Sequence, residues 1–149
     1  MSKKQLLIIS FFTIILITIF HFFSIKYNWY WTYRWLDIPV HIVAGFWVSI
    51  TTLWVSLRTR HIDSIIGYRS KALFVMLISV LAVAILWELF ELIFKLTSFY
   101  DKGYWQDSLG DILNGFAGGI MAFLYFTRNR RAKSDIVEIE HRDNFIVIL

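Results

Sequence analysis

The run "ALFVMLISVLAVAILWELFELIFKLT" (72–97) is almost entirely apolar, and its charged residues lie near its end. A helix needs about 20 such residues to cross the hydrocarbon core of a bilayer. Three further apolar runs lie at about 6–25, 38–57 and 108–127. Each is predicted to be a helix, because strand edges would leave unpaired backbone groups in lipid. The sequence therefore predicts an all-α, four-helix transmembrane bundle, residues 1–131, followed by a short tail, 132–149.

The overall composition agrees with a membrane protein. Of the 149 residues, 58% are hydrophobic and 17% are charged, whereas soluble domains have about 25% charged residues. The chain has no cysteine, which excludes disulfides and thiolate metal sites. The net charge of +4 comes from basic residues between the apolar runs. Basic residues in the connections between apolar runs are typical of charges that determine membrane topology. We therefore expect no nucleic-acid partner.

Basic residues predict the orientation of the spans. They cluster before the first run, between the second and third, and after the fourth: Lys3, Lys4, Arg58, Arg60, Arg69, Lys71, Arg128, Arg130, Arg131 and Lys133. The other two connections hold Lys26, Arg34 and Lys102. Cytoplasmic loops carry the excess of Lys and Arg. We therefore expect a multi-pass protein of the plasma (inner) membrane with both termini in the cytoplasm.

The first run, "QLLIISFFTIILITIFHFFSI" (5–25), has some features of a signal peptide. It is longer than the usual apolar core of such peptides and lacks a small-x-small cleavage site. We interpret it as a retained first span.

Two segments on the predicted outer side are dense in Trp and Tyr: "YNWYWTYRW" (27–35) and "FYDKGYW" (99–105). Aromatic residues of this kind concentrate at membrane–water interfaces. The segments are either a rim around the entrance of a site or anchors at the interface alone.

The tail has a different pattern. Apolar and charged residues alternate in "IVEIE" (136–140), and the polar "HRDN" (141–144) precedes "FIVIL" (145–149). Alternation indicates a short cytoplasmic hairpin. A disordered end is the alternative, since an isolated hairpin is marginally stable in water.

Ionisable residues inside the spans are few and share helix faces. Asp37 and His41 are four residues apart, and Glu88 and Glu91 are three apart. The last span begins with Asp107, Asp111 and Asn114 at steps of four and three. Residues at these spacings lie on one face of a helix. All of them fall in the outer half of the membrane, so we expect them to meet in the bundle interior. Gly115, Gly118 and Gly119 would let a neighbouring helix approach closely.

Intramembrane carboxylates and an imidazole indicate a functional site. A divalent ion such as Zn²⁺, Mn²⁺, Mg²⁺ or Ca²⁺ would cancel the repulsion among the carboxylates and could activate water for hydrolysis. Glu88, Asp111 and His41 are the expected catalytic core, and Asp37, Glu91, Asp107 and Asn114 are supporting residues. The candidate metal ligands are His41, Glu88, Glu91, Asp107 and Asp111. The expected substrate is a lipid or a lipid-linked envelope component, and the bundle could form a homo-oligomer.

Other readings of the same residues remain open. Asp37, two residues before Pro39, could cap its helix, as could Asp107. Coupled carboxyls and a histidine also form proton or ion relays in transporters, although no charged group continues to the cytoplasmic half. In a third reading the protein is a non-catalytic accessory protein whose "FIVIL" end binds a partner by strand addition.

Three motifs, "DIPVHIVAG" (37–45), "WELFE" (87–91) and "DSLGDILNGFAGG" (107–119), resemble those of VanZ-like membrane proteins. The YjdF-like inner-membrane proteins share much of this pattern, and Glu91 is closer to their form. The resemblance covers roughly residues 35–127 and matches Asp37, His41, Glu88, Asp107, Asp111, Asn114 and Gly118. It implies a four- or five-span envelope protein, and some members are linked to low-level glycopeptide-antibiotic resistance. It supports a shared site and names no reaction.

Overall fold

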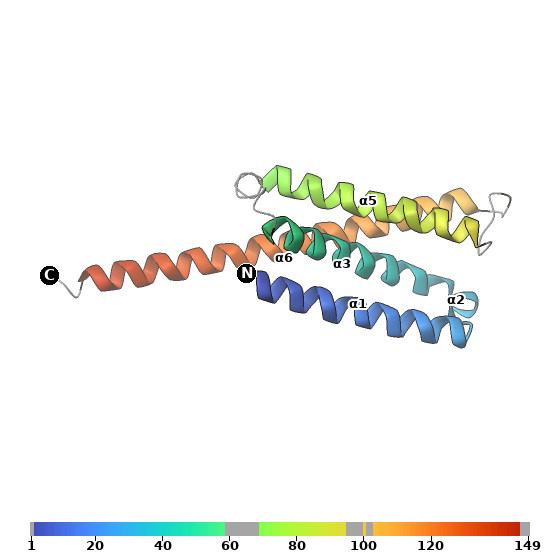
Figure 1. Ribbon diagram of the computed structural model, residues 1–149, viewed down its shortest axis with the longest axis horizontal. Helices are drawn as coiled ribbons and strands as arrows, with labels where there is room; N and C mark the ends of the chain where they lie inside the picture. The colour runs from blue at the N-terminus through green and yellow to red at the C-terminus, as the bar shows by residue number, and fades with distance from the viewer. Residues whose placement is uncertain (1, 59–68, 95–99, 101–102, 147–149) are drawn as a thin grey trace.

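The computed structural model describes residues 2–58, 69–94, 100 and 103–146 of the chain. Its four long helices are α1 (Lys3–Lys26), α3 (Asp37–Arg58), α5 (Arg69–Ile93) and α6 (Tyr104–Ile146). The short α2 (Trp29–Thr32) and a 3-10 turn, η1 (Arg34–Leu36), connect α1 to α3 (Figure 1). Each long helix contains a segment long and apolar enough to cross a membrane. The described residues contain no strand, so the prediction of an all-α bundle with four spans is confirmed.

The helix boundaries follow from local chemistry. Ser2 and Gln5 form a reciprocal capping box at the start of α1, with hydrogen bonds of 2.8 and 3.2 Å, which satisfies two backbone donors. Asn28 adopts a left-handed conformation (φ 55°) between α1 and α2, and Asn tolerates this region better than most residues. Helix α5 ends at Ile93, and the last residues of the run expected there, 95–97, lie outside the described residues.

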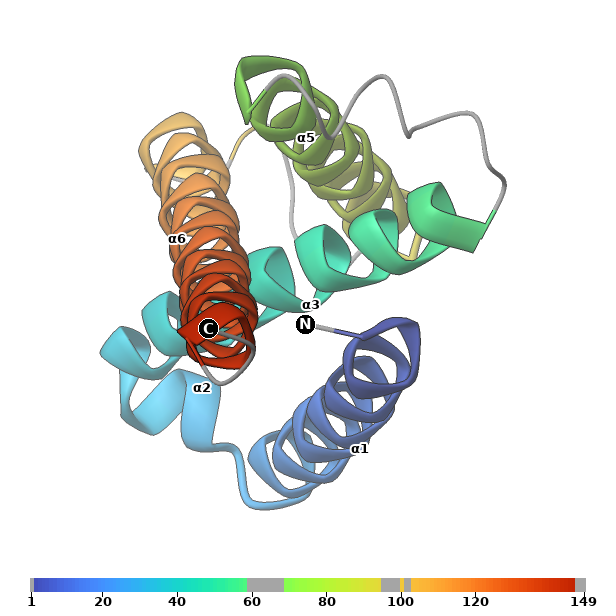
Figure 2. The same cartoon turned by 90° about the vertical axis from the view of Figure 1, so that its left-hand side faces the viewer.

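Helix α3 is the central element of the bundle. It packs against α1, α5 and α6, and Figure 2 shows it crossing obliquely between them. Near the end where α1 begins, the core is apolar and is formed by Leu6, Ile50, Leu53, Met76, Ala122 and Phe126. A hydrogen bond of 2.7 Å between Ser10 and Thr51 joins α1 to α3 in the same half. This half is therefore packed, while the ionisable residues lie toward the opposite end.

Glycines bring the backbones of α3 and α6 into direct contact. A Cβ atom added to Gly45 would overlap the backbone of Gly115, and one added to Gly118 would overlap the carbonyl group of Ile42. Close approach of this kind is typical of helix pairs in membranes. The prediction that small residues of the last span admit a neighbouring helix is confirmed, and that neighbour is α3.

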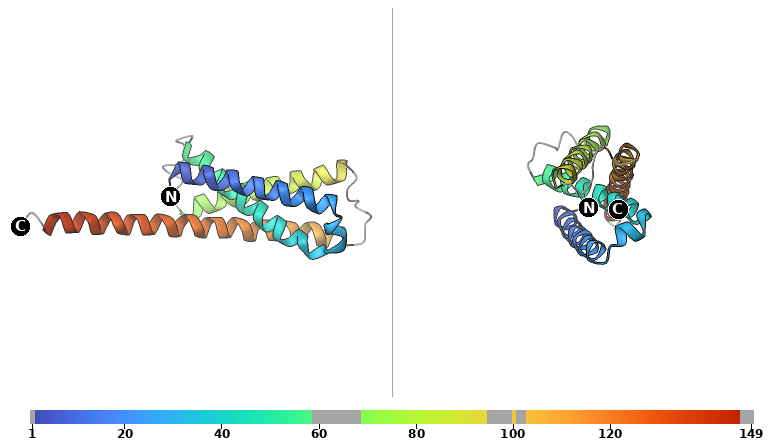
Figure 3. Two further views of the ribbon diagram at one scale, coloured as in Figure 1. Left: turned by 90° about the horizontal axis from the view of Figure 1, so that it is seen from below. Right: turned by 90° about the vertical axis from the view of Figure 1, so that its right-hand side faces the viewer.

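The tail is the main difference from the sequence-based expectation. Helix α6 starts at Tyr104, earlier than the expected 108, and continues beyond its apolar segment (Tyr104–Asn129) to Ile146. It projects from the end of the bundle where α1 begins (Figure 3). The hairpin interpretation of residues 132–149 is therefore wrong for residues 132–146, which are helical. Residues 147–149 lie outside the described residues. No Gly or Pro follows Gly119, so nothing in the sequence terminates the helix.

Candidate metal centre

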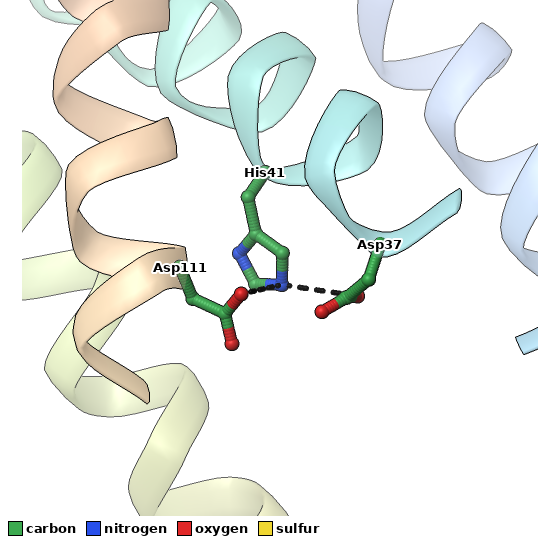
Figure 4. Close-up of side chains that lie close together, drawn as sticks. All are labelled: Asp37, His41 and Asp111. Atoms are coloured by element: carbon green, nitrogen blue, oxygen red, sulfur yellow. Dashed lines mark ion pairs between the residues drawn. The ribbon is translucent and has the colours of Figure 1, made fainter. Parts of the chain in front are cut away.

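Three of the predicted site residues meet where α3 and α6 cross. The Nε2 atom of His41 lies 3.3 Å from Oδ1 of Asp37 and 3.5 Å from Oδ1 of Asp111 (Figure 4). One potential ligand atom from each residue lies within 4.8 Å of the other two. The side chains of His41 and Asp111 are 16% and 14% exposed, whereas that of Asp37 is 35% exposed. The group is thus shielded on its inner side and accessible at Asp37.

The sequence positions these residues through two simple devices. Asp37 and His41 are one turn apart on α3, so their side chains share a face. Asp111 lies one turn before Gly115 on α6, and His41 lies one turn before Gly45 on α3. Because Gly45 meets the backbone of Gly115, the side chains one turn earlier on each helix face one another.

The interatomic distances are compatible both with an ion pair and with binding of a metal ion. A charged N–H···O hydrogen bond is usually about 2.7–2.9 Å long, and both distances at Nε2 are longer, at 3.3 and 3.5 Å. Two ligand atoms bound at about 2.1 Å to a tetrahedral ion lie about 3.4 Å apart. One imidazole and two carboxylates are suitable ligands for Zn²⁺ or Mn²⁺. These three residues could therefore hold a divalent cation.

Asp37 is a member of this group and not a helix cap. Its backbone is helical (φ −64°, ψ −40°) and follows directly on η1, whereas an N-cap residue has a non-helical backbone. The capping alternative for Asp37 is therefore wrong.

Asp107 and Asn114, two expected supporting residues, flank Asp111 on α6. Asp107 is exposed in the first turn of α6 and, because the helix starts at Tyr104, is not its N-cap either. It still interacts electrostatically with Asp111. Asn114 is half-buried one turn further along the helix than Asp111. Among the described residues, the group that could hold a metal ion includes Asp111 but not Asp107.

Glu88 belongs to a second polar cluster, which joins α5 to the start of α6. Its Oε2 atom accepts hydrogen bonds from the hydroxyl groups of Ser108 (2.7 Å) and Tyr104 (3.1 Å). Tyr104 is buried, with 8% of its surface exposed. The sequence interpretation missed Ser108 and Tyr104, although their spacing of four residues places both hydroxyl groups on one face of α6.

Glu91 and His21 lie on the other side of the site. The indole Nε1 of Trp87 donates a hydrogen bond of 2.8 Å to Glu91, and Nδ1 of His21 is 3.0 Å from the hydroxyl of Tyr30. Glu91 interacts electrostatically with Asp37 and His41, and His21 interacts with Asp37. Glu91 and His21 therefore lie within electrostatic range of the Asp37–His41–Asp111 group.

Tyr30 lies between the first two spans. Burial, together with the negative charge of Asp37, raises the pKa of the Tyr30 phenol above its ordinary value. The hydroxyl group therefore stays protonated at neutral pH and remains available for a hydrogen bond with His21.

Comparison with known proteins identifies the family. The sequence profile of a family described as "Predicted membrane protein (DUF2238)" matches residues 2–132, which include all four spans and every candidate site residue. The chain belongs to this family. It is an integral, multi-pass membrane protein. Searches of curated proteins and of solved structures each returned no match.

Proposed function

We propose that this protein is a metal-dependent hydrolase of VanZ/YjdF type in the plasma membrane, acting on a lipid or a lipid-linked envelope component. The observation that carries the proposal is the convergence of His41 Nε2 with carboxylate oxygens of Asp37 and Asp111 within 4.8 Å. Two carboxylates held together in a membrane repel one another strongly, and a divalent cation removes this repulsion.

The chemistry follows from what a divalent cation would supply at these three residues. Held by His41, Asp37 and Asp111, such an ion would act as a Lewis acid and make water a stronger nucleophile at neutral pH. The reaction that this chemistry supports is hydrolysis, in which the bond from a phosphorus or carbonyl carbon of the substrate to its leaving oxygen would be replaced by a bond to the oxygen of water. Glu88, held by two hydroxyl groups, is our candidate to take the proton of the water and return it to the leaving oxygen.

The substrate class follows from the position of the site. Asp37 is the first residue of α3, so the group lies close to the end of the bundle that carries the aromatic segments. The basic residues of the other end assign that end to the cytoplasm by the positive-inside rule. An amphiphile in the outer leaflet would then place its polar head at the metal and keep its chains in lipid.

Metal content is the direct test. Detergent-purified protein is incubated separately with Zn²⁺, Mn²⁺, Mg²⁺ and Ca²⁺, desalted and assayed by elemental analysis. We expect about one ion per chain, lost in His41→Ala and Asp111→Asn. Asp107→Asn is the matched control, because Asp107 is an exposed aspartate one turn away on the same helix, and it should keep the ion. Absence of every ion from the wild type, or retention in both site variants, would contradict the proposal.

Hydrolysis is tested separately. Lipid extracts from cells expressing wild type or Asp111→Asn are compared by mass spectrometry. A lipid-linked species depleted by the wild type alone, with its hydrolysis product increased, is the expected result. If the protein binds metal but the lipid profiles of the two cell types are identical, the protein is a metal-binding protein and the hydrolase proposal is wrong.

A further inference from the structure

The second set of contacts near the site joins α1 and α2 to α5. The rings of His21 and Trp87 meet edge to face with centroids 5.8 Å apart. Each ring also has a hydrogen-bond partner: the Tyr30 hydroxyl lies 3.0 Å from Nδ1 of His21, and Trp87 donates to Glu91 at 2.8 Å. A contact between α1 and α5 is thus fixed by side chains from three elements.

The helices joined by this contact are the two that are least buried. In the most apolar windows of α1 and α5, 6% and 11% of the residues are buried, compared with 28% and 33% in α3 and α6. Helices α1 and α5 therefore present most of their surface to lipid. Figure 2 shows them on different sides of α3, which packs against both. The His21–Trp87 contact joins these two helices.

The same contact lies beside the candidate metal centre. Asp37 interacts electrostatically with both His21 and Tyr30, and Glu91 interacts with Asp37 and His41. The ring contact itself is easily broken, because an edge-to-face pair contributes little beyond its buried area. Trp87 is 37% exposed and lies outside the apolar core cluster.

We infer that the Tyr30–His21–Trp87–Glu91 contacts close a lateral entrance between α1 and α5, through which an amphiphile reaches the Asp37–His41–Asp111 group from the outer leaflet. This inference rests on the proposed metal site and specifies the route of its substrate. Water-soluble molecules reach the same group at its exposed member, Asp37, from the aqueous end of the bundle.

Two chelators distinguish these routes. Zinc-loaded protein in lipid nanodiscs is exposed either to EDTA, which stays in water, or to an alkylated hydroxyquinoline dissolved in the bilayer, and zinc loss is followed over time. Tyr30→Phe removes one hydroxyl group and Trp87→Ala removes the ring contact. We expect both variants to lose zinc to the membrane-dissolved chelator roughly fivefold faster, the factor produced by losing one ordinary hydrogen bond. The rate of loss to EDTA should stay unchanged.

Trp31→Ala is the matched control, because Trp31 is an aromatic residue of α2 that is 73% exposed at the same interface. It should behave as the wild type with both chelators. Equal acceleration with EDTA, or no acceleration in Trp87→Ala, would overturn the lateral entrance while leaving the metal site intact. A wild type that binds no zinc or other divalent ion would overturn both proposals.

Discussion

His41 on α3 and Asp111 on α6 face one another at 3.5 Å, and one turn further along the same helices Gly45 meets the backbone of Gly115. The glycine contact sets the distance between the helices, and the polar contact depends on that distance. The crossing of α3 and α6 is therefore both the closest packing in this part of the bundle and the support of the candidate site.

Substitution at this crossing should destabilise the protein. Gly45→Ala and Gly118→Ala each place a methyl group against the backbone of the neighbouring helix. Overpacking of this kind costs about 1–3 kcal/mol, measurable as a lower midpoint of thermal unfolding in detergent. Gly110→Ala is the control, because an added Cβ there has no neighbour within 4 Å, and it should be neutral or stabilise the helix by about 0.5–1 kcal/mol. Equal effects at all three positions would show that the crossing is not tightly packed.

Metal removal should lower the unfolding midpoint of the wild type and leave that of the site variants unchanged. A ligand that binds the folded state at 100 times its dissociation constant stabilises it by about 2.7 kcal/mol. We expect EDTA to lower the unfolding midpoint of the wild type and of Asp107→Asn. It should have no effect on His41→Ala, which lacks the central ligand. An EDTA effect that persists in His41→Ala would place the ion elsewhere.

The bundle and part of the site could be predicted from sequence because both depend on periodicity. Hydropathy located the four spans, and the spacing of four residues placed Asp37 beside His41. The glycines of the last span indicated a close neighbour, which explains why Asp111 meets His41. Periodicity shows which residues share a face of a helix. It does not show toward which neighbouring helix that face is turned, so the hydrogen-bond partners of Glu88 and Glu91 could not be derived.

Two boundaries were missed for related physical reasons. The segment before Ser108 mixes polar and aromatic residues, which indicates an interface as readily as a first helical turn. Tyr104, which binds Glu88, was therefore excluded from the last span. In the tail, the alternation of "IVEIE" indicates a strand, whereas the absence of Gly and Pro after Gly119 favours continuation of the helix. The continuous helix α6 shows that the second feature decides the structure there.

The cluster around Glu88 should stabilise the junction of α5 and α6 without contributing to metal binding. Ser108→Ala removes the donor and Glu88→Ala removes the acceptor of a 2.7 Å hydrogen bond. Hydrogen bonds to charged groups contribute about 1.5–3 kcal/mol, so a double-mutant cycle of unfolding free energies should give a coupling of roughly that size. Both single variants should keep the metal content of the wild type. No coupling, or metal loss in Ser108→Ala, would contradict this separation of the two clusters.

Orientation in the membrane can be measured directly because the chain has no cysteine. Single substitutions Trp31→Cys in α2 and Lys4→Cys in α1 place thiols at exposed positions near opposite ends of the bundle. The positive-inside rule predicts that Trp31→Cys faces the outside and Lys4→Cys the cytoplasm. In intact cells a membrane-impermeant maleimide should label Trp31→Cys alone, and Lys4→Cys should react only after permeabilisation. The reverse pattern would place the candidate metal centre on the cytoplasmic side, and substrates of the outer leaflet would then be excluded.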